Sequence, residues 1–182
     1  NFINDIDRNG KIMNYFRQSI LSGLNEYYVI LKRSLDSLSE EEILWKPNPH
    51  SNNVIFLIWH MALVEDNLIN KVLLGKERVW ITENYYKDFP ELRNETGFAF
   101  NQEKLDKFPI VDIDWLMNYH NILREGTIKF ITNIEDEDLS LDYTFGIRQV
   151  KGYFVIGRLM TELSQHLGQV SYIRGMIRGL DK

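Results

Sequence analysis

The chain has 182 residues, of which 44% are apolar and 26% charged, and its formal net charge is −5. These values are typical of a globular protein with one sizeable core, so we expect a single domain over residues 1–182. The acidic balance and the absence of any Lys/Arg cluster argue against binding to nucleic acid or to an anionic membrane. No apolar run suits a membrane span, no signal peptide is recognisable, and the chain has no cysteine. We therefore expect a cytoplasmic protein without disulfides.

The first predicted element is a helix from Arg8 to about Ser37. Its helical apolar stripe is formed by Ile12, Tyr15, Phe16, Ser19, Ile20, Gly23 and Leu24. Ser39 and Glu42 have the spacing of a capping box, which predicts a short helical turn after this helix. Pro47 and Pro49 then interrupt the path before the next helix.

The second predicted helix is strongly apolar and runs from Val54 to Leu74, with Gly75 as its stop signal. Periodicity is lost between Lys76 and Asp112, although this insert is rich in aromatic residues. They are Trp80, Tyr85, Tyr86, Phe89, Phe98, Phe100 and Phe108. So many large rings cannot all stay in water, so we expect the insert to cover the helices or a neighbouring subunit.

The third predicted helix runs from about Asp114 to Asn133. The glycines and the alternating pattern between Leu139 and Tyr153 indicate a short β-hairpin, and a long helix from Tyr153 to Arg178 follows. The predicted fold is therefore an all-α four-helix bundle, with a long insert between its second and third helices and a small hairpin before the fourth.

Polar residues interrupt the most apolar face of the last predicted helix. At about 100° per residue, one stripe is formed by Val155, Leu159, Glu162, His166, Gln169, Ile173 and Ile177. Burying Glu162, His166 and Gln169 without partners would be costly, so other polar groups must meet them in the interior. His60 is the obvious partner, because it lies on the apolar face of the second predicted helix.

These residue types suit a divalent metal ion. Glu162 and His166 are one helical turn apart, close enough for both to bind one ion at about 2.0 to 2.2 Å. With His60 they would form a set of two imidazoles and one carboxylate, which leaves a coordination position open, as in catalytic zinc sites. A core hydrogen-bond network of the same residues, completed by Gln169 and without a metal, explains the spacing equally well.

Three stretches of the sequence carry a resemblance to a known family. They are Leu38 to Pro47, Asn53 through Trp59-His60 to Glu65-Asp66, and His166-Leu167-Gly168-Gln169 with Arg174 beyond it. In these stretches the chain resembles the DinB/YfiT-like metalloenzymes, which are four-helix bundles. The resemblance implies a divalent-metal site formed by one His of the second helix and an H-x3-H pair of the last.

One ligand position departs from that pattern, because Glu162 stands where many members of the family have a histidine. The related mycothiol-dependent maleylpyruvate isomerases are similar to this chain in their His, Glu, His set. The resemblance therefore favours a metal bound by His60, Glu162 and His166, with zinc as the expected ion and nickel or iron as alternatives. Gln169 is then expected to support the ligands or to line the pocket.

The resemblance also implies a function and an assembly. It favours a transferase or isomerase that uses a low-molecular-weight thiol and acts on a small-molecule substrate. A metal-dependent hydrolase, or a stress-related metal-binding bundle without turnover, would keep the same ligands. A homodimer is expected both from the resemblance and from the surplus of aromatic rings in the insert.

Other polar residues are weaker candidates for a role. His120 lies on the core-facing side of the third predicted helix, where we expect a hydrogen-bonded core histidine, with a fourth metal ligand or a general base as the alternatives. His50 follows two prolines and is expected at the surface. Four cationic side chains could bind an anionic substrate or simply be solvated; they are Arg148, Lys151, Arg158 and Arg174.

Overall fold

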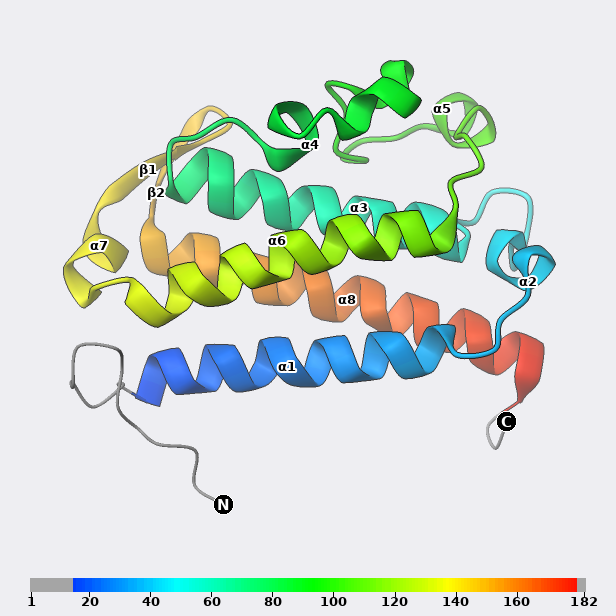
Figure 1. Cartoon of the computed structure of the whole chain (residues 1–182), viewed down its shortest axis with the longest axis horizontal. Coiled ribbons are helices and arrows are strands. Elements are labelled where there is room, and N and C mark those ends of the chain that lie inside the picture. The colour runs from blue at the N-terminus through cyan, green and yellow to red at the C-terminus, as the bar shows by residue number, and fades with distance from the viewer. Residues whose placement is uncertain (1–14, 180–182) are drawn as a thin grey trace.

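The computed structural model describes residues 15–179. Four long helical segments form the bundle (Figure 1): α1 (Tyr15–Leu35), α3 (Val54–Asp66), α6 (Ile113–Asn133) and α8 (Gly152–Arg178). A π-helical segment, η1 (Asn67–Leu73), continues α3. The predicted all-α four-helix bundle is confirmed. That residues 1–182 form a single domain stays a prediction.

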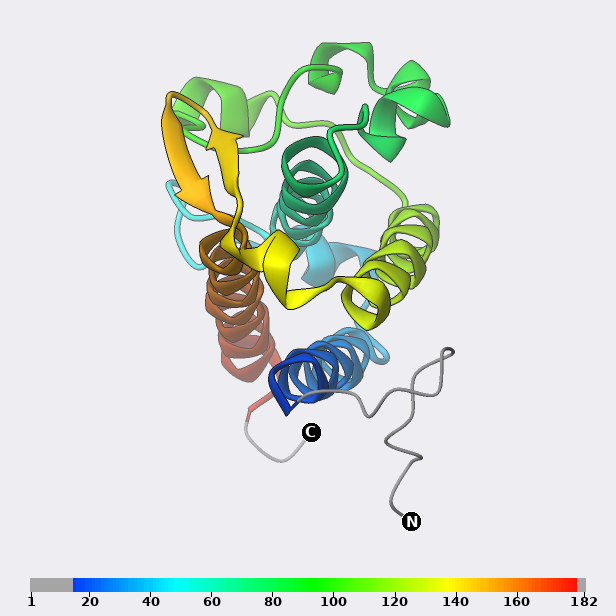
Figure 2. The same ribbon diagram turned by 90° about the vertical axis from the view of Figure 1, so that its left-hand side faces the viewer.

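Each long helix packs against two others, in the cyclic order α1, α8, α3 and α6. The end-on view in Figure 2 shows this arrangement. In Figure 1, α3 and α6 run in one direction and α1 and α8 in the other. Because α3 and α6 are parallel neighbours, the chain must return along the length of the bundle between them. The long insert between α3 and α6 makes that return.

Short elements connect the long helices. They are α2 (Glu40–Leu44), α4 (Val79–Thr82), η2 (Tyr85–Asp88), η3 (Pro90–Leu92), α5 (Gln102–Asp106) and α7 (Asp136–Ser140). The predicted capping box is confirmed: Ser39 Oγ accepts from the Glu42 backbone N–H, and the Glu42 carboxylate accepts from the Ser39 N–H. The predicted hairpin is also present, as antiparallel β1 (Asp142–Phe145) and β2 (Arg148–Lys151), with Asp142 paired to Lys151.

The helix α3 is the centre of the core. Every residue from Val54 to Leu63 is buried, so this helix is apolar on all sides rather than amphipathic. It is covered by α6 on one side, by α8 on another and by the insert on a third (Figures 1 and 2). Asn53 caps its first turn by accepting from the Phe56 N–H. Any polar side chain on α3 is therefore placed inside the protein.

The insert packs its rings on its own bundle. Phe100 and Phe108 contact Phe56 and Trp59 of α3, at centroid distances of 5.0 to 5.7 Å. Trp80 is fully buried, whereas Phe98 is 78% exposed. Apart from Phe98, these rings therefore find cover within one chain and do not themselves require a second subunit.

The predicted face of the first helix is corrected by the structure. Residues 8–14, where that helix was expected to begin, lie outside the described residues. Within α1, Tyr15 and Phe16 are exposed, and the buried residues are Arg17, Leu24, Tyr27, Leu31 and Ser34. In the middle of α1 the predicted stripe does face the core, since Leu24 is buried and Ile20 packs against the core. The prediction is wrong at the start of the helix, where Tyr15 and Phe16 are exposed.

Among residues 15–179, no helix combines the length and the apolar character needed to cross a membrane.

Candidate metal centre

His60, Glu162 and His166 lie together between α3 and α8. The Nε2 atom of His60 is 3.6 Å from Glu162 Oε2, and the Nε2 atom of His166 is 3.4 Å from the same oxygen. One ligand atom from each residue lies within 4.8 Å of the others. The two imidazole rings meet edge to face, with centroids 4.8 Å apart. The three side chains expected to share one ion are therefore brought to one place.

Each of these residues reaches the cluster from a well-formed helix. Glu162 and His166 are one turn apart in the middle of the 27-residue helix α8. His60 is in the buried stretch of α3, where the ring of Phe56 is stacked on it at 6° between planes. His60 and Glu162 are each 7% exposed, whereas the His166 side chain is 13% exposed. The cluster is thus mostly enclosed and approaches solvent on the side of His166.

Hydrogen bonds at the Nδ1 atoms direct both imidazoles. Nδ1 of His60 bonds to the backbone carbonyl of Thr96, at 2.5 Å. Nδ1 of His166 bonds to Oε1 of Gln169, at 2.8 Å. Carbonyl oxygens only accept, so Nδ1 is the donor in both bonds, and in a neutral ring of this tautomer Nε2 keeps a free lone pair. Both lone pairs are on the atoms nearest Glu162, which is the arrangement that metal-binding histidines use.

The electrostatic setting of the cluster also suits a cation. Burial lowers the pKa of His60, and the neighbouring His166 acts in the same direction. His60 is therefore neutral at neutral pH, as a metal ligand must be. On Glu162, the Arg158 guanidinium pairs with Oε1, while Oε2 faces the two imidazoles. The donor set of two imidazole nitrogens and one carboxylate oxygen fits a borderline-soft divalent ion.

Gln169 is placed partly as expected. Its contact with His166 agrees with a supporting role, but its side chain is exposed rather than buried. The helical stripe did not predict this exposure, because Ile173, one turn further along the same stripe, is buried.

His120 is placed in the core, outside the cluster of His60, Glu162 and His166. It is fully buried, and its Nε2 is 3.1 Å from the hydroxyl of Tyr27. Burial lowers its pKa to about 3, with the nearby Arg124 cation as a second cause. This neutral histidine belongs to a buried polar network that also contains the ion pair of Arg124 with Glu65, at 2.8 Å.

The other candidates have structural or surface contacts. His50 is exposed, and its ring is 3.1 Å from Gln102 Oε1. Arg174 donates to the backbone carbonyl of Asp36, and Lys151 pairs with Asp142 across the hairpin. Arg158 is the cation that the structure places beside the cluster.

Sequence reasoning missed the part that the insert plays at the cluster. Thr96 contributes a backbone carbonyl, which every residue type has, so no side-chain pattern could have indicated it. Gly97 follows with φ +83°, and a Cβ built there would lie 2.5 Å from Nδ1 of His60. The one available signal was the Thr-Gly pair itself, since a glycine often marks a close approach of the backbone.

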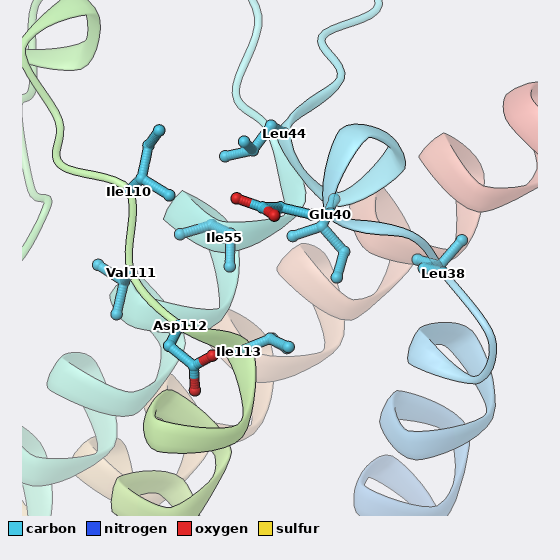
Figure 3. A pocket seen from close by; sticks show the side chains of 9 residues that line it. Leu38, Glu40, Leu44, Ile55, Ile110, Val111, Asp112 and Ile113 are labelled. Carbon is cyan, nitrogen blue, oxygen red and sulfur yellow. The ribbon is translucent and has the colours of Figure 1, made fainter.

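A pocket of about 390 Å³ lies elsewhere in the molecule, between α2, the first turn of α3 and the start of α6 (Figure 3). Its lining is mainly apolar, with Glu40 and Asp112 as the acidic residues. Asp112 already accepts from the Trp115 N–H as the cap of α6. The pocket contains none of the three cluster residues, so it does not provide a substrate cavity for them.

The fold and the site together define a four-helix bundle with a His, Glu, His cluster between its second and last long helices. The family model of the DinB superfamily matches residues 28–170. The chain therefore belongs to the DinB superfamily.

A solved structure has the same fold. The crystal structure of a conserved protein from Enterococcus faecalis superposes with a TM-score of 0.78 over 90% of this chain and 97% of that one. The two sequences are 22% identical, so this likeness concerns the fold alone. No curated protein matches the chain.

Proposed function

We propose that this protein is a divalent-metal-dependent enzyme whose ion is bound by His60 Nε2, Glu162 Oε2 and His166 Nε2. The observation that carries the proposal is the approach of these atoms to within 4.8 Å of one another. The bonds at both Nδ1 atoms support it, because they leave the Nε2 lone pairs for a cation. Zinc suits this donor set best, and nickel or iron would also accept it.

Three protein ligands leave room for a further ligand, and a bound divalent ion would supply Lewis-acid activation of a thiol or water at neutral pH. The residues around it have separate tasks. Thr96 and Gln169 hold the imidazoles in the required tautomer. The Arg158 guanidinium pairs with Oε1 of Glu162, which favours binding of the metal ion through Oε2 alone. The enclosed position of His60 and Glu162 limits access of bulk water.

We favour a small-molecule reaction that uses a low-molecular-weight thiol, either transfer or isomerisation, in the cytoplasm. Membership of the DinB superfamily supports this class, together with the likeness of the His, Glu, His set to mycothiol-dependent isomerases. A metal-dependent hydrolase would use the same ligands with water in place of the thiol. The alternative to an enzyme is a stress-related metal-binding protein without turnover.

Activity measurements separate these functions. Zinc-loaded and zinc-stripped protein would be incubated with cysteine, glutathione or mycothiol and a panel of electrophiles that includes maleylpyruvate, with Glu162→Gln as the control. Zinc-dependent turnover only with thiol supports the favoured class. Turnover of ester or amide substrates without thiol supports a hydrolase. Full zinc occupancy with no turnover on either panel supports a non-catalytic metal-binding protein.

We also propose a homodimer, but the structural argument for it is not the aromatic insert on which the sequence analysis relied. The insert rings other than Phe98 are packed on their own bundle, so the insert no longer argues for a partner. Large apolar side chains are exposed on two neighbouring helices instead, among them Val29 of α1 and Tyr172 and Met176 of α8. Light scattering at micromolar concentration tests the assembly, and a monomeric mass would contradict the dimer without affecting the metal site.

A further inference from the structure

The start of the insert is tied to α3 by a buried carboxylate. Asp66 is fully buried, and its oxygens accept from the backbone N–H groups of Val79 and Trp80, at 3.0 and 2.9 Å. The Tyr119 hydroxyl of α6 donates to the same carboxylate, at 2.6 Å. These charge-assisted bonds fix the backbone around residue 78 relative to the bundle.

The side chain of Arg78 binds a later part of the insert, residues 93–95. Its side chain is buried, at 5% exposure for the residue. Nη1 donates to the backbone carbonyl of Glu95, at 3.0 Å, and Nη2 to that of Arg93, at 2.9 Å. A planar guanidinium can bond two carbonyls at a fixed spacing, which a single ammonium does less well. Arg78 therefore holds residues 93–95 in one position.

The next two residues of that segment touch the metal centre. The Thr96 carbonyl is bonded to Nδ1 of His60, and the backbone of Gly97 lies against the same ring. A displacement of the segment would separate the Thr96 carbonyl from His60. The imidazole would then be free to turn or to place its proton on Nε2, which would remove the lone pair needed by a cation.

We propose that Arg78 is a positioning residue of the metal centre, acting through the Thr96 carbonyl to hold His60 with Nε2 ready for an ion. The inference rests on the proposed metal site. The long insert between α3 and α6 would then have two roles. It covers the core, and it supplies the backbone carbonyl that orients the metal ligand His60 of α3. Arg78 acts on His60 through residues 93–96, so the link depends on the path of the insert and not on neighbours within one helix.

The test compares Arg78→Met with Arg17→Met. Arg17 is a matched control, because it is buried to a similar extent and pairs with Glu135, away from the insert. Two quantities would be measured: the tautomer of His60 by nitrogen-15 NMR on metal-free protein, and zinc affinity by competition with a chelator. The first readout needs no bound metal, and general destabilisation would not change it.

We expect wild-type protein and Arg17→Met to show His60 protonated on Nδ1 alone, with equal zinc affinity. Arg78→Met should show a mixture of tautomers and bind zinc about 10 to 100 times more weakly. Arg78→Lys should fall between them, and it takes the place of Arg78→Met in the comparison if the latter does not fold.

Two outcomes would overturn the inference alone: a folded Arg78→Met protein with wild-type tautomer and affinity, or equal losses in the Arg17 and Arg78 variants. If wild-type protein bound no zinc, the proposed metal site would fail as well.

Discussion

Arg158 and Glu162 are paired one turn apart on α8, and the pair assigns different tasks to the two oxygens of the carboxylate. Oε1 meets the guanidinium, and Oε2 lies within 3.6 Å of a nitrogen of each histidine. A bound ion would therefore meet a carboxylate that is already oriented, with its negative charge partly balanced by a cation outside the cluster.

Removing that charge should abolish tight metal binding. Glu162→Gln keeps the size of the side chain but replaces the anionic ligand by a neutral amide. We expect zinc affinity to fall by more than about 100-fold, because the loss of a direct ligand should exceed the 10- to 100-fold effect of losing a supporting contact. Calorimetric titration of metal-free protein measures this. Glu125→Gln, an exposed change on α6, should bind as wild type; equal affinity in both variants would exclude Glu162 as a ligand.

Gln169 should act on metal affinity through the acceptor oxygen that His166 uses. Gln169→Leu removes that acceptor, so we expect zinc affinity to fall about tenfold. Gln169→Glu keeps an acceptor and should bind zinc at least as tightly as wild type. Because Gln169 is exposed, the melting temperature of the metal-free protein should change little. Unchanged zinc affinity in Gln169→Leu would remove the proposed role.

Gly97 should be intolerant of a side chain because of its contact with His60. Gly97→Ala adds a Cβ that would lie 2.5 Å from Nδ1 of His60, at a backbone φ of +83°. Gly75→Ala is the matched control, since its φ is +63° but no atom lies within 4 Å of the added Cβ. Both should lose about 1 to 2 kcal/mol of stability from the left-handed backbone.

Zinc affinity distinguishes the two glycine variants. We expect it to fall at least tenfold in Gly97→Ala and to stay at the wild-type value in Gly75→Ala, as measured by competition with a chelator. If the affinities of the two variants were equal, the close approach of the insert to His60 would have no part in metal binding.

His120 should make the stability of the metal-free protein depend on pH. Its pKa in the folded protein is about 3, lowered by burial, whereas an unfolded histidine titrates near 6.5. The unfolded chain therefore binds more protons in this interval, so the free energy of unfolding falls as the pH drops from about 6.5 towards about 3. The expected loss is about 1.4 kcal/mol for each pH unit.

Comparison with His120→Gln isolates this contribution. Urea unfolding at about pH 7.5 and pH 5 should show that wild type loses about 2 kcal/mol relative to the variant. Other groups cancel in the difference, including His60, whose pKa is also lowered, and Glu65, whose pKa is raised by burial. A difference that does not change with pH would show that His120 is not held neutral in the core.

The sequence was sufficient for the four long helices and for the three clustered residues. Glu162 interrupts an apolar stripe of α8, so helical periodicity directs it inward, whereas His60 lies on a helix that is buried on all sides, so any face of it is interior. Periodicity did not predict the exposure of Gln169, which lies on the same stripe as the buried Ile173. The Thr96 contact was not predictable, because it depends on a backbone carbonyl and on a loop path set by Asp66 and Arg78.

The central claim is that one divalent ion is bound between α3 and α8. Diffraction from crystals grown with zinc, with data collected at the zinc absorption edge, tests it most directly. We predict one anomalous peak per chain, at about 2.0 to 2.2 Å from His60 Nε2, Glu162 Oε2 and His166 Nε2. A fully formed cluster without a peak under saturating zinc, or a peak bonded to other residues, would contradict the account.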